Sequence, residues 1–202
     1  MTERIVIKIG GATFFQRNGF EHELRPLLNQ NPNAQVWLLV GGGDLIESMR
    51  TIHQIYPSLN AEEIHWRCVE LLDHSWALAK EIVPFDHSIT NGQELNQASL
   101  NRVEPSICWV RVEAFYNRQD CNSIPEQWLP TSSWNTTTDA LAWLLGKMID
   151  ADRVILLKKC ECDPNWSIAE AAKRGIIDTE LARLVQSNPG ERPIVELYKS
   201  QE

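Results

Sequence analysis

One segment constrains the fold more than any other, because a buried strand, a glycine turn and a helix follow one another without a break. Residues 36–40 are apolar at every position, which is typical of a strand covered by helices on both faces of a sheet. Three glycines follow, and from residue 44 to residue 56 apolar side chains recur at helical spacing. This succession is the repeating unit of an α/β protein with a parallel sheet.

The same alternation runs along the rest of the chain. Strands are predicted at residues 5–9, 35–40, 81–85, 107–112, 153–157 and 194–198. Further helices are predicted over 61–83 and 137–149, a loop or short helix over 90–104, and an irregular segment over 119–130. No linker divides the chain. We therefore predict one domain over residues 1–202, an α/β sandwich of three layers (αβα) with a mostly parallel central sheet.

Composition narrows the classes of partner. The net charge is −8 and the pI is about 5.2. This acidic balance argues against binding to nucleic acids or anionic membranes but allows binding of a small anionic ligand. No signal peptide or membrane-length apolar run is visible, and the odd count of 5 cysteines is typical of reduced thiols. We expect a cytoplasmic protein that binds a small anionic molecule and neither nucleic acid nor membrane.

A lysine and two glycines end the first predicted strand. Gly10 and Gly11 let the backbone approach an anion and turn N–H groups toward it, and Lys8 adds a charge that can reach phosphate oxygens. The alternative is an edge lysine followed by an ordinary turn. This segment alone leaves both interpretations open.

A glycine triplet, Gly41, Gly42 and Gly43, stands between a buried strand and a helix N-terminus, where backbone N–H groups favour anions. A tight turn is the alternative, but it needs fewer glycines, and each one costs roughly 0.5–1 kcal/mol in folding relative to alanine. Neither glycine segment is a P-loop or a dinucleotide-binding fingerprint. The triplet therefore favours an anion site of another kind.

Short hydroxyl side chains precede the helix predicted at 137–149. Five of the seven residues at 132–138 are serine or threonine, which is more than a helix N-cap requires. Such a cluster can bind an anionic or polyhydroxy substrate. Asp139 follows it and suits the first turn of a helix.

Two further lysines complete the set of candidate site residues. Lys158 and Lys159 end the strand predicted at 153–157, and the carboxyl ends of parallel strands share one edge of a sheet. Lys8, the glycine triplet, Asp139 and Lys158 are therefore expected to converge, with Asp139 offsetting the repulsion between ammonium groups. The histidines and cysteines show no metal-ligand spacing, so no metal ligands are predicted.

Together these segments resemble the amino acid kinase family. The family pattern is a Lys-x-Gly-Gly opening, a strand ending in Gly-Gly-Gly and a Thr-Thr-Asp-x-x-Ala helix, and the resemblance spans residues 6 to about 184. Within the family, residues 65–66, 72–73 and 133–139 are most similar to the (aminomethyl)furanyl-methyl phosphate kinases of methanofuran biosynthesis. Uridylate kinases come second.

The resemblance implies an ATP-dependent kinase that transfers the γ-phosphoryl group to a small acidic acceptor, such as the phosphate monoester (aminomethyl)furanyl-methyl phosphate. Lys8 would hold the transferring group, Asp139 would organise the lysines, and Lys158 would add a second positive charge. ATP and phosphate groups would be bound by Gly10, Gly11, Gly41, Gly42, Gly43 and Lys159, and the acceptor by Asp44, Ser133, Trp134, Thr137 and Thr138. Mg²⁺ would bridge ATP phosphates, no general base is needed, and the family implies a homo-oligomer.

One turn departs from the family pattern. Glu161 stands near the family's aspartate, and Cys162 stands where glycine is usual and tolerates a positive φ far less well. This turn keeps open a non-catalytic ligand-binding member of the family. Two other interpretations also stay open, a uridylate kinase-like nucleotide kinase and a scaffold whose 8 tryptophans form an oligomer interface.

Overall fold

One parallel sheet of six strands organises the protein. The structure is a computed structural model that describes residues 2–15, 19–163 and 165–199. The strands lie in the order β3-β4-β2-β1-β5-β6, and every neighbouring pair is parallel. Their bounds are β1 (Arg4–Ile9), β2 (Gln35–Val40), β3 (His87–Ile89), β4 (Ser106–Val110), β5 (Arg153–Lys158) and β6 (Ile194–Lys199).

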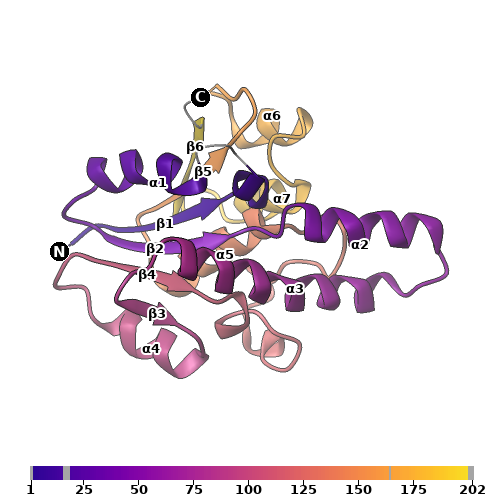
Figure 1. The fold of residues 1–202 in the computed structure, drawn as a ribbon, viewed down its shortest axis with the longest axis horizontal. Helices are drawn as coiled ribbons and strands as arrows, with labels where there is room; N and C mark the ends of the chain where they lie inside the picture. The colour runs from indigo at the N-terminus through magenta and orange to yellow at the C-terminus, as the bar shows by residue number, and fades with distance from the viewer. Residues whose placement is uncertain (1, 16–18, 164, 200–202) are drawn as a thin grey trace.

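Helices cover both faces of this sheet (Figure 1). The α-helices are α1 (Gly19–Gln30), α2 (Asp44–Ile55), α3 (Ala61–Ile82), α4 (Gly92–Leu100), α5 (Thr138–Met148), α6 (Ile168–Lys173) and α7 (Thr179–Ser187). Short 3₁₀ helices are η1 (Gly11–Phe15), η2 (Val112–Ala114) and η3 (Cys121–Ser123). α2 and α3 run side by side and project beyond the carboxyl ends of β1 and β2 (Figure 1).

Two hydrophobic clusters lie on the two faces of the sheet, because successive strand side chains point to opposite sides. Ile5, Ile7 and Ile9 of β1 belong to one cluster, which includes residues of α1. Val6 belongs to the other, which includes residues of α5 and α7. The predicted three-layer α/β class is confirmed, and the sheet is parallel throughout the described strands.

The strand predicted at 81–85 is wrong. α3 continues to Ile82, because Ala79 and Val83 are buried in the cluster that contains α1. Pro84 follows, and proline disfavours helical backbone at the residue before it. The third strand instead begins at His87 and pairs with β4. Residues 90–104 were predicted to form a loop or a short helix, and the short helix is observed as α4. The helices α1, α6 and α7 were not predicted from the sequence.

Parallel pairing brings the carboxyl ends of all strands to one edge of the sheet. β1 is central there, since Lys8 is in register with Leu39 of β2 on one side and with Leu156 of β5 on the other. The chain adds β2, β3 and β4 on one side of β1 and then crosses to add β5 and β6 on the other. Open α/β sheets bind ligands at the edge where the connections diverge in this way.

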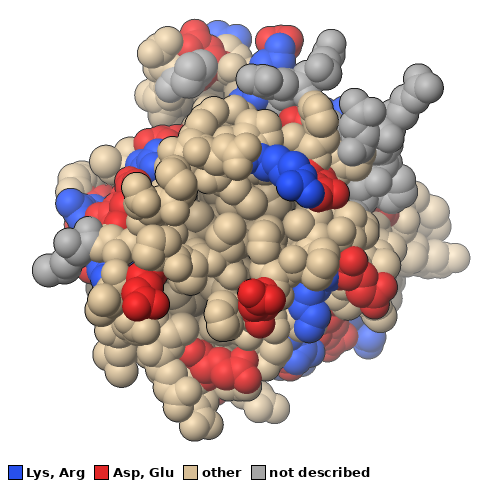
Figure 2. Space-filling model, turned by 60° about the vertical axis from the view of Figure 1, so that its left-hand side comes forward, with Lys and Arg blue, Asp and Glu red and all other residues tan. Residues whose placement is uncertain are grey.

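The helices and the surface charges can be compared with what a membrane or a charged partner would require. None of the helices in the described ranges is long and apolar enough to cross a membrane. On the face shown in Figure 2, Lys and Arg side chains lie beside Asp and Glu side chains, with wide uncharged areas between them. Side chains of both signs are therefore spread over that face.

Candidate functional site

Two lysines and an aspartate lie together at the carboxyl edge of β1 and β5. Lys8 is on β1, Lys158 is the last residue of β5, and Asp139 is in the first turn of α5. The Lys8 Nζ atom is 2.9 Å from Asp139 Oδ1, and Lys158 Nζ donates a hydrogen bond to Asp139 Oδ2. The side chains of Lys8 and Asp139 are only 8% and 3% exposed. The structure thus brings these three sequence-predicted residues into direct contact.

Charge pairing outweighs burial at Asp139. Burial alone favours the neutral carboxyl group, but Lys8 and then Lys158 oppose it and lower the pKa of Asp139 to about 2. For Lys8, burial is the largest influence and lowers its pKa, against the opposing charge of Asp139. Asp139 is therefore ionised at neutral pH and holds two positive side chains close together.

A second carboxyl group, that of Asp178, holds the start of α5 in place. Its Oδ2 atom accepts hydrogen bonds from the N–H and hydroxyl groups of Thr137, at 2.8 and 2.7 Å, and from the Ala140 N–H at 3.2 Å. Its Oδ1 atom accepts from the Leu181 N–H and so caps α7. Burial, and then the charge of Asp139, raises the pKa of Asp178 to about 6. The sequence analysis missed Asp178, for which an N-cap aspartate was the available signal.

The raised pKa of Asp178 predicts a pH-dependent stability. The carboxyl group titrates near 3.8 when unfolded and near 6 when folded, so the native state loses stability as pH rises through this window. The loss is on the order of 1–3 kcal/mol. Asp178→Asn keeps a hydrogen-bond acceptor without titrating. Its unfolding free energy, measured in urea, should depend less on pH between about 4 and about 7. An equal pH dependence in the two proteins contradicts this.

The two glycine turns pack against each other through their backbones. A Cβ atom on Gly11 would lie 2.0 Å from the backbone nitrogen of Gly43, and one on Gly43 would lie 2.6 Å from the carbonyl carbon of Gly11. Gly43 also has a φ of +53°, which other residues rarely adopt. At Gly41, a Cβ atom would lie 2.9 Å from the hydroxyl oxygen of Thr138. These glycines therefore have a packing role, whatever they bind.

Alanine at two adjacent positions should reveal this packing role. Gly11→Ala is expected to lower the unfolding free energy by about 1–3 kcal/mol or more, because the two backbones must move apart. Gly10→Ala is the matched control, since its Cβ atom would lie at an ordinary 3.7 Å from the carbonyl oxygen of Leu157. Urea unfolding compares the two, and equal losses of stability would refute the packing argument.

A cavity of about 280 Å³ opens beside the glycine turns, and we call it the acceptor cavity because the residues predicted to bind the acceptor line it. The sequence-predicted residues that line it are Lys8, Gly11, Gly41, Gly42, Gly43, Asp44, Ser133, Trp134, Thr137 and Thr138. The sequence analysis missed the wall that α2, α3 and α5 contribute, with Ile46, Glu47, Arg50, Cys68, Val69, Leu72 and Leu141. Ile46 and Arg50 lie one helical turn apart after the glycine triplet, a spacing that could have indicated them.

The remaining sequence-predicted residues do not line this cavity. Asp139 and Lys158 reach it only through Lys8, which Asp139 contacts. The Gly10 carbonyl oxygen accepts hydrogen bonds from the N–H and hydroxyl groups of Thr13, at 3.0 and 2.6 Å. Lys159 is exposed just after β5. A role of Gly10 or Lys159 in binding ATP stays a prediction.

α2 begins at the acceptor cavity without a side-chain cap. Its N-cap is Gly43, so no side chain accepts a hydrogen bond from the first-turn N–H groups. Side chains do cap α3, α4, α5, α6 and α7, those of Asn60, Asn91, Thr137, Ser167 and Asp178. Because Gly43 and Asp44 line the cavity, the positive end of the α2 dipole lies against it.

The turn after β5 does not need the glycine that is usual in the family. Asp150 is the only non-glycine residue with a positive φ in the part of the chain that the structure describes, so Cys162 has an ordinary backbone conformation. Its side chain belongs to a hydrophobic cluster, and burial raises the pKa of its thiol. Glu161 is exposed and forms an ion pair with Lys199 of β6. The expected strain at Cys162 is therefore not observed.

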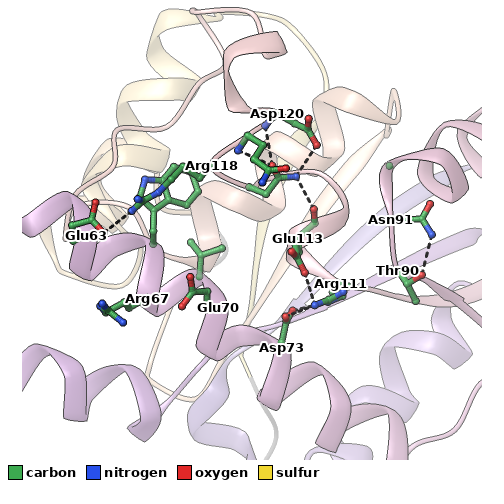
Figure 3. Close-up of a pocket in the computed structure, with 15 residues that line it drawn as sticks. Glu63, Arg67, Glu70, Asp73, Thr90, Asn91, Arg111, Glu113, Arg118 and Asp120 are labelled. Carbon is green, nitrogen blue, oxygen red and sulfur yellow. Dashed lines mark hydrogen bonds and ion pairs between the residues drawn. The ribbon is translucent and has the colours of Figure 1, made fainter.

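A larger cavity, of about 670 Å³, borders a different face of α3 and the ends of β3 and β4. Two of its three arginines are already paired, Arg111 with Asp73 and Glu113, and Arg118 with Glu63 (Figure 3). Carboxylates outnumber guanidinium groups in its lining. Such a lining repels a polyphosphate, so size alone does not make this cavity the candidate active site.

Comparison with known proteins places the fold. No family model and no curated protein matches the sequence. A uridylate kinase from Archaeoglobus fulgidus is 18% identical, with a TM-score of 0.57, and the match covers 97% of this chain and 90% of that chain. A UMP kinase from Bacillus anthracis is 11% identical, with a TM-score of 0.61, over 98% of this chain and 87% of that chain. Identities this low concern the fold alone, and on that ground the chain has the amino acid kinase fold.

Proposed function

We propose that the protein is an ATP-dependent kinase that transfers the γ-phosphoryl group to a small anionic acceptor. The observation that carries the proposal is the contact of Lys8, Asp139 and Lys158 beside the uncapped start of α2. Two ammonium groups and a helix N-terminus at the carboxyl edge of a parallel sheet favour phosphate groups. The fold likeness to two kinases supports the same conclusion.

The geometry suits the requirements of phosphoryl transfer, which are positioning and charge stabilisation more than covalent chemistry. Lys8, on the cavity wall, would contact the transferring group and the charge that spreads over its oxygens. Lys158 would add positive charge from the end of β5, and Asp139 would keep both ammonium groups in place. Because Lys8 and Asp139 are almost fully buried, these charges act with little screening by water.

The described residues fit phosphate groups better than a resident metal ion. They include no group of three or more His, Cys, Asp or Glu side chains that could hold a metal. Mg²⁺ would therefore be held by the phosphate oxygens of ATP, where it neutralises part of their charge. The residues that would bind those phosphates are Lys8, Lys158, Lys159 and the glycine turns.

We assign the acceptor to the phosphate monoesters with a small organic group, of which (aminomethyl)furanyl-methyl phosphate is the leading candidate. The support is the acceptor cavity, which is compact and joins phosphate-binding groups to the apolar side chains of Ile46, Leu72 and Leu141. A uridylate kinase-like activity is the second candidate, favoured by the fold likeness to UMP kinases. A homo-oligomer, a single domain over residues 1–202 and a cytoplasmic location stay predictions.

An assay of ADP formation tests this function. The protein is mixed with Mg-ATP and with (aminomethyl)furanyl-methyl phosphate, UMP or no acceptor. We expect acceptor-dependent ADP, and a diphosphate product visible by ³¹P NMR, with the furan ester. ADP formed only with UMP would make the uridylate kinase-like activity the leading candidate in place of the furan ester kinase. No ADP with either acceptor, together with no ATP binding by calorimetry, would favour the non-catalytic alternative.

A further inference from the structure

One arginine of the acceptor cavity has no part in the mechanism above. Arg50 lies on α2, one helical turn after Ile46, and both line the cavity. Among the described residues of that lining, Arg50 and Lys8 are the two that carry a lysine or arginine side chain. Lys8 is paired with Asp139 at 2.9 Å, whereas the ion-pair contact of Arg50, with Glu47, is longer, at 3.5 Å.

A chain of contacts holds Arg50 in position. Its guanidinium carbon lies over the Trp134 ring, 5.1 Å from the ring centroid. The Trp134 indole N–H donates a hydrogen bond to His53 Nδ1 at 2.6 Å. His53 Nδ1 is thus an acceptor, so the ring proton is on Nε2, which donates to the Leu59 carbonyl oxygen at 3.1 Å. Trp134 is thereby tied to α2 and supplies a fixed platform for the arginine.

The guanidinium group keeps hydrogen-bonding capacity in this position. Arg50 Nε is a buried donor without a hydrogen-bond partner among the described residues. The nearest ion-pair partner is Glu47, whose Oε1 atom is 3.5 Å from Arg50 Nε, beyond the usual distance for such a bond. Buried donors are nearly always paired in native proteins, so an unpaired one indicates a site for an acceptor group. A phosphate oxygen would meet that need and displace the loose contact with Glu47.

We propose that Arg50 binds the phosphate group of the acceptor and determines the specificity of the cavity for phosphate monoesters. The guanidinium group would hold the phosphate by its planar donors, and the organic group would lie on the apolar wall of Ile46, Leu72 and Leu141. Trp134 and His53 act as positioning residues for Arg50. This inference rests on the proposed function only for the identity of the cavity as the acceptor site.

Binding of phenyl phosphate, measured by calorimetry without ATP, tests the proposal. This probe combines a phosphate monoester with a small planar apolar group. Arg50→Met is expected to weaken binding about tenfold or more, and Arg50→Lys to restore part of it, because lysine keeps the charge but not the planar donors. Arg67→Met is the matched control, since Arg67 lies on α3 and lines only the larger cavity. It should bind like the wild type.

Trp134→Phe adds a readout of the positioning role. Phenylalanine keeps an aromatic face but lacks the N–H that bonds to His53, so we expect weaker binding than in the wild type and tighter binding than in Arg50→Met. Wild-type affinity in Arg50→Met, no binding by the wild type, or an equal loss in Arg67→Met each overturns the proposal. Because ATP is absent, these results stand apart from a failure of the kinase assay. If turnover is found, Arg50→Met should raise the KM for the acceptor and leave the KM for ATP unchanged.

Discussion

Replacing Lys8 by methionine is expected to lower kcat by on the order of 10²–10³, the usual effect of removing one group that stabilises transition-state charge. Methionine has a similar length and is apolar, so it fills the same buried space at the end of β1. The loss is therefore one of charge and not of packing. Steady-state assays with saturating Mg-ATP and acceptor measure it.

A second buried lysine provides the matched control for this prediction. Lys147, in the last turn of α5, is 9% exposed and forms an ion pair with Glu191. The exposed fraction of its side chain is close to that of Lys8, but its partner Glu191 is exposed and it lies at the other end of the helix that carries Asp139. Lys147→Met should leave kcat within about twofold of the wild type. An unchanged rate in Lys8→Met would remove Lys8 from the mechanism.

Replacing Asp139 by asparagine is expected to lower the unfolding free energy by about 3–5 kcal/mol, the usual cost of removing one partner of a buried ion pair. The carboxylate balances both Lys8 and Lys158, so the variant leaves two ammonium groups close together, with Lys8 almost fully buried. Urea unfolding at neutral pH measures the change. A loss below about 1 kcal/mol would mean that these charges are solvated and not paired.

The double variant Lys8→Met with Asp139→Asn separates electrostatic from packing effects. If the loss in Asp139→Asn comes from an uncompensated charge on Lys8, removing that charge should recover part of the stability. A double-mutant cycle should then give an interaction free energy of about 1–3 kcal/mol between the two positions. If the losses of unfolding free energy in the two single variants simply add, Asp139 stabilises the protein independently of Lys8, for example at the N-terminus of α5.

Local patterns predict most of the sheet. The strands expected at 5–9, 35–40 and 153–157 match β1, β2 and β5 to within one residue. These strands are buried on both faces, and their continuous apolar runs have flanking turn residues that mark both ends. The strand expected at 81–85 fails because an apolar run of strand length does not distinguish a strand from the buried end of a helix. Long-range packing of the end of α3 against β2 and β4 makes that choice, and the Trp109 indole N–H donates a hydrogen bond to the Val83 carbonyl oxygen.

Some residues of the candidate site can likewise be found from local sequence patterns, and others only from the structure. Lys8, the glycine triplet and Asp139 stand at motif positions, so sequence reasoning can single them out. Arg50 stands within an ordinary helical stretch, and Asp178 stands before a helix that was not predicted. Each has only a general local signal, which is helical spacing from Ile46 for Arg50 and N-cap chemistry for Asp178. The packing reason for the glycines cannot be read from the sequence either. In each turn, the space for a Cβ atom is taken by backbone atoms of the other turn.

By itself, the sequence determines the alternation of strands and helices and the chemical groups at the strand ends, because periodicity and residue type belong to neighbouring positions. Only the tertiary structure decides which groups meet. Asp178 contacts a threonine 41 positions away, and Trp134 contacts a histidine 81 positions away. Such contacts depend on how helices pack on the sheet, and that packing is the sum of many distant interactions that no local pattern contains.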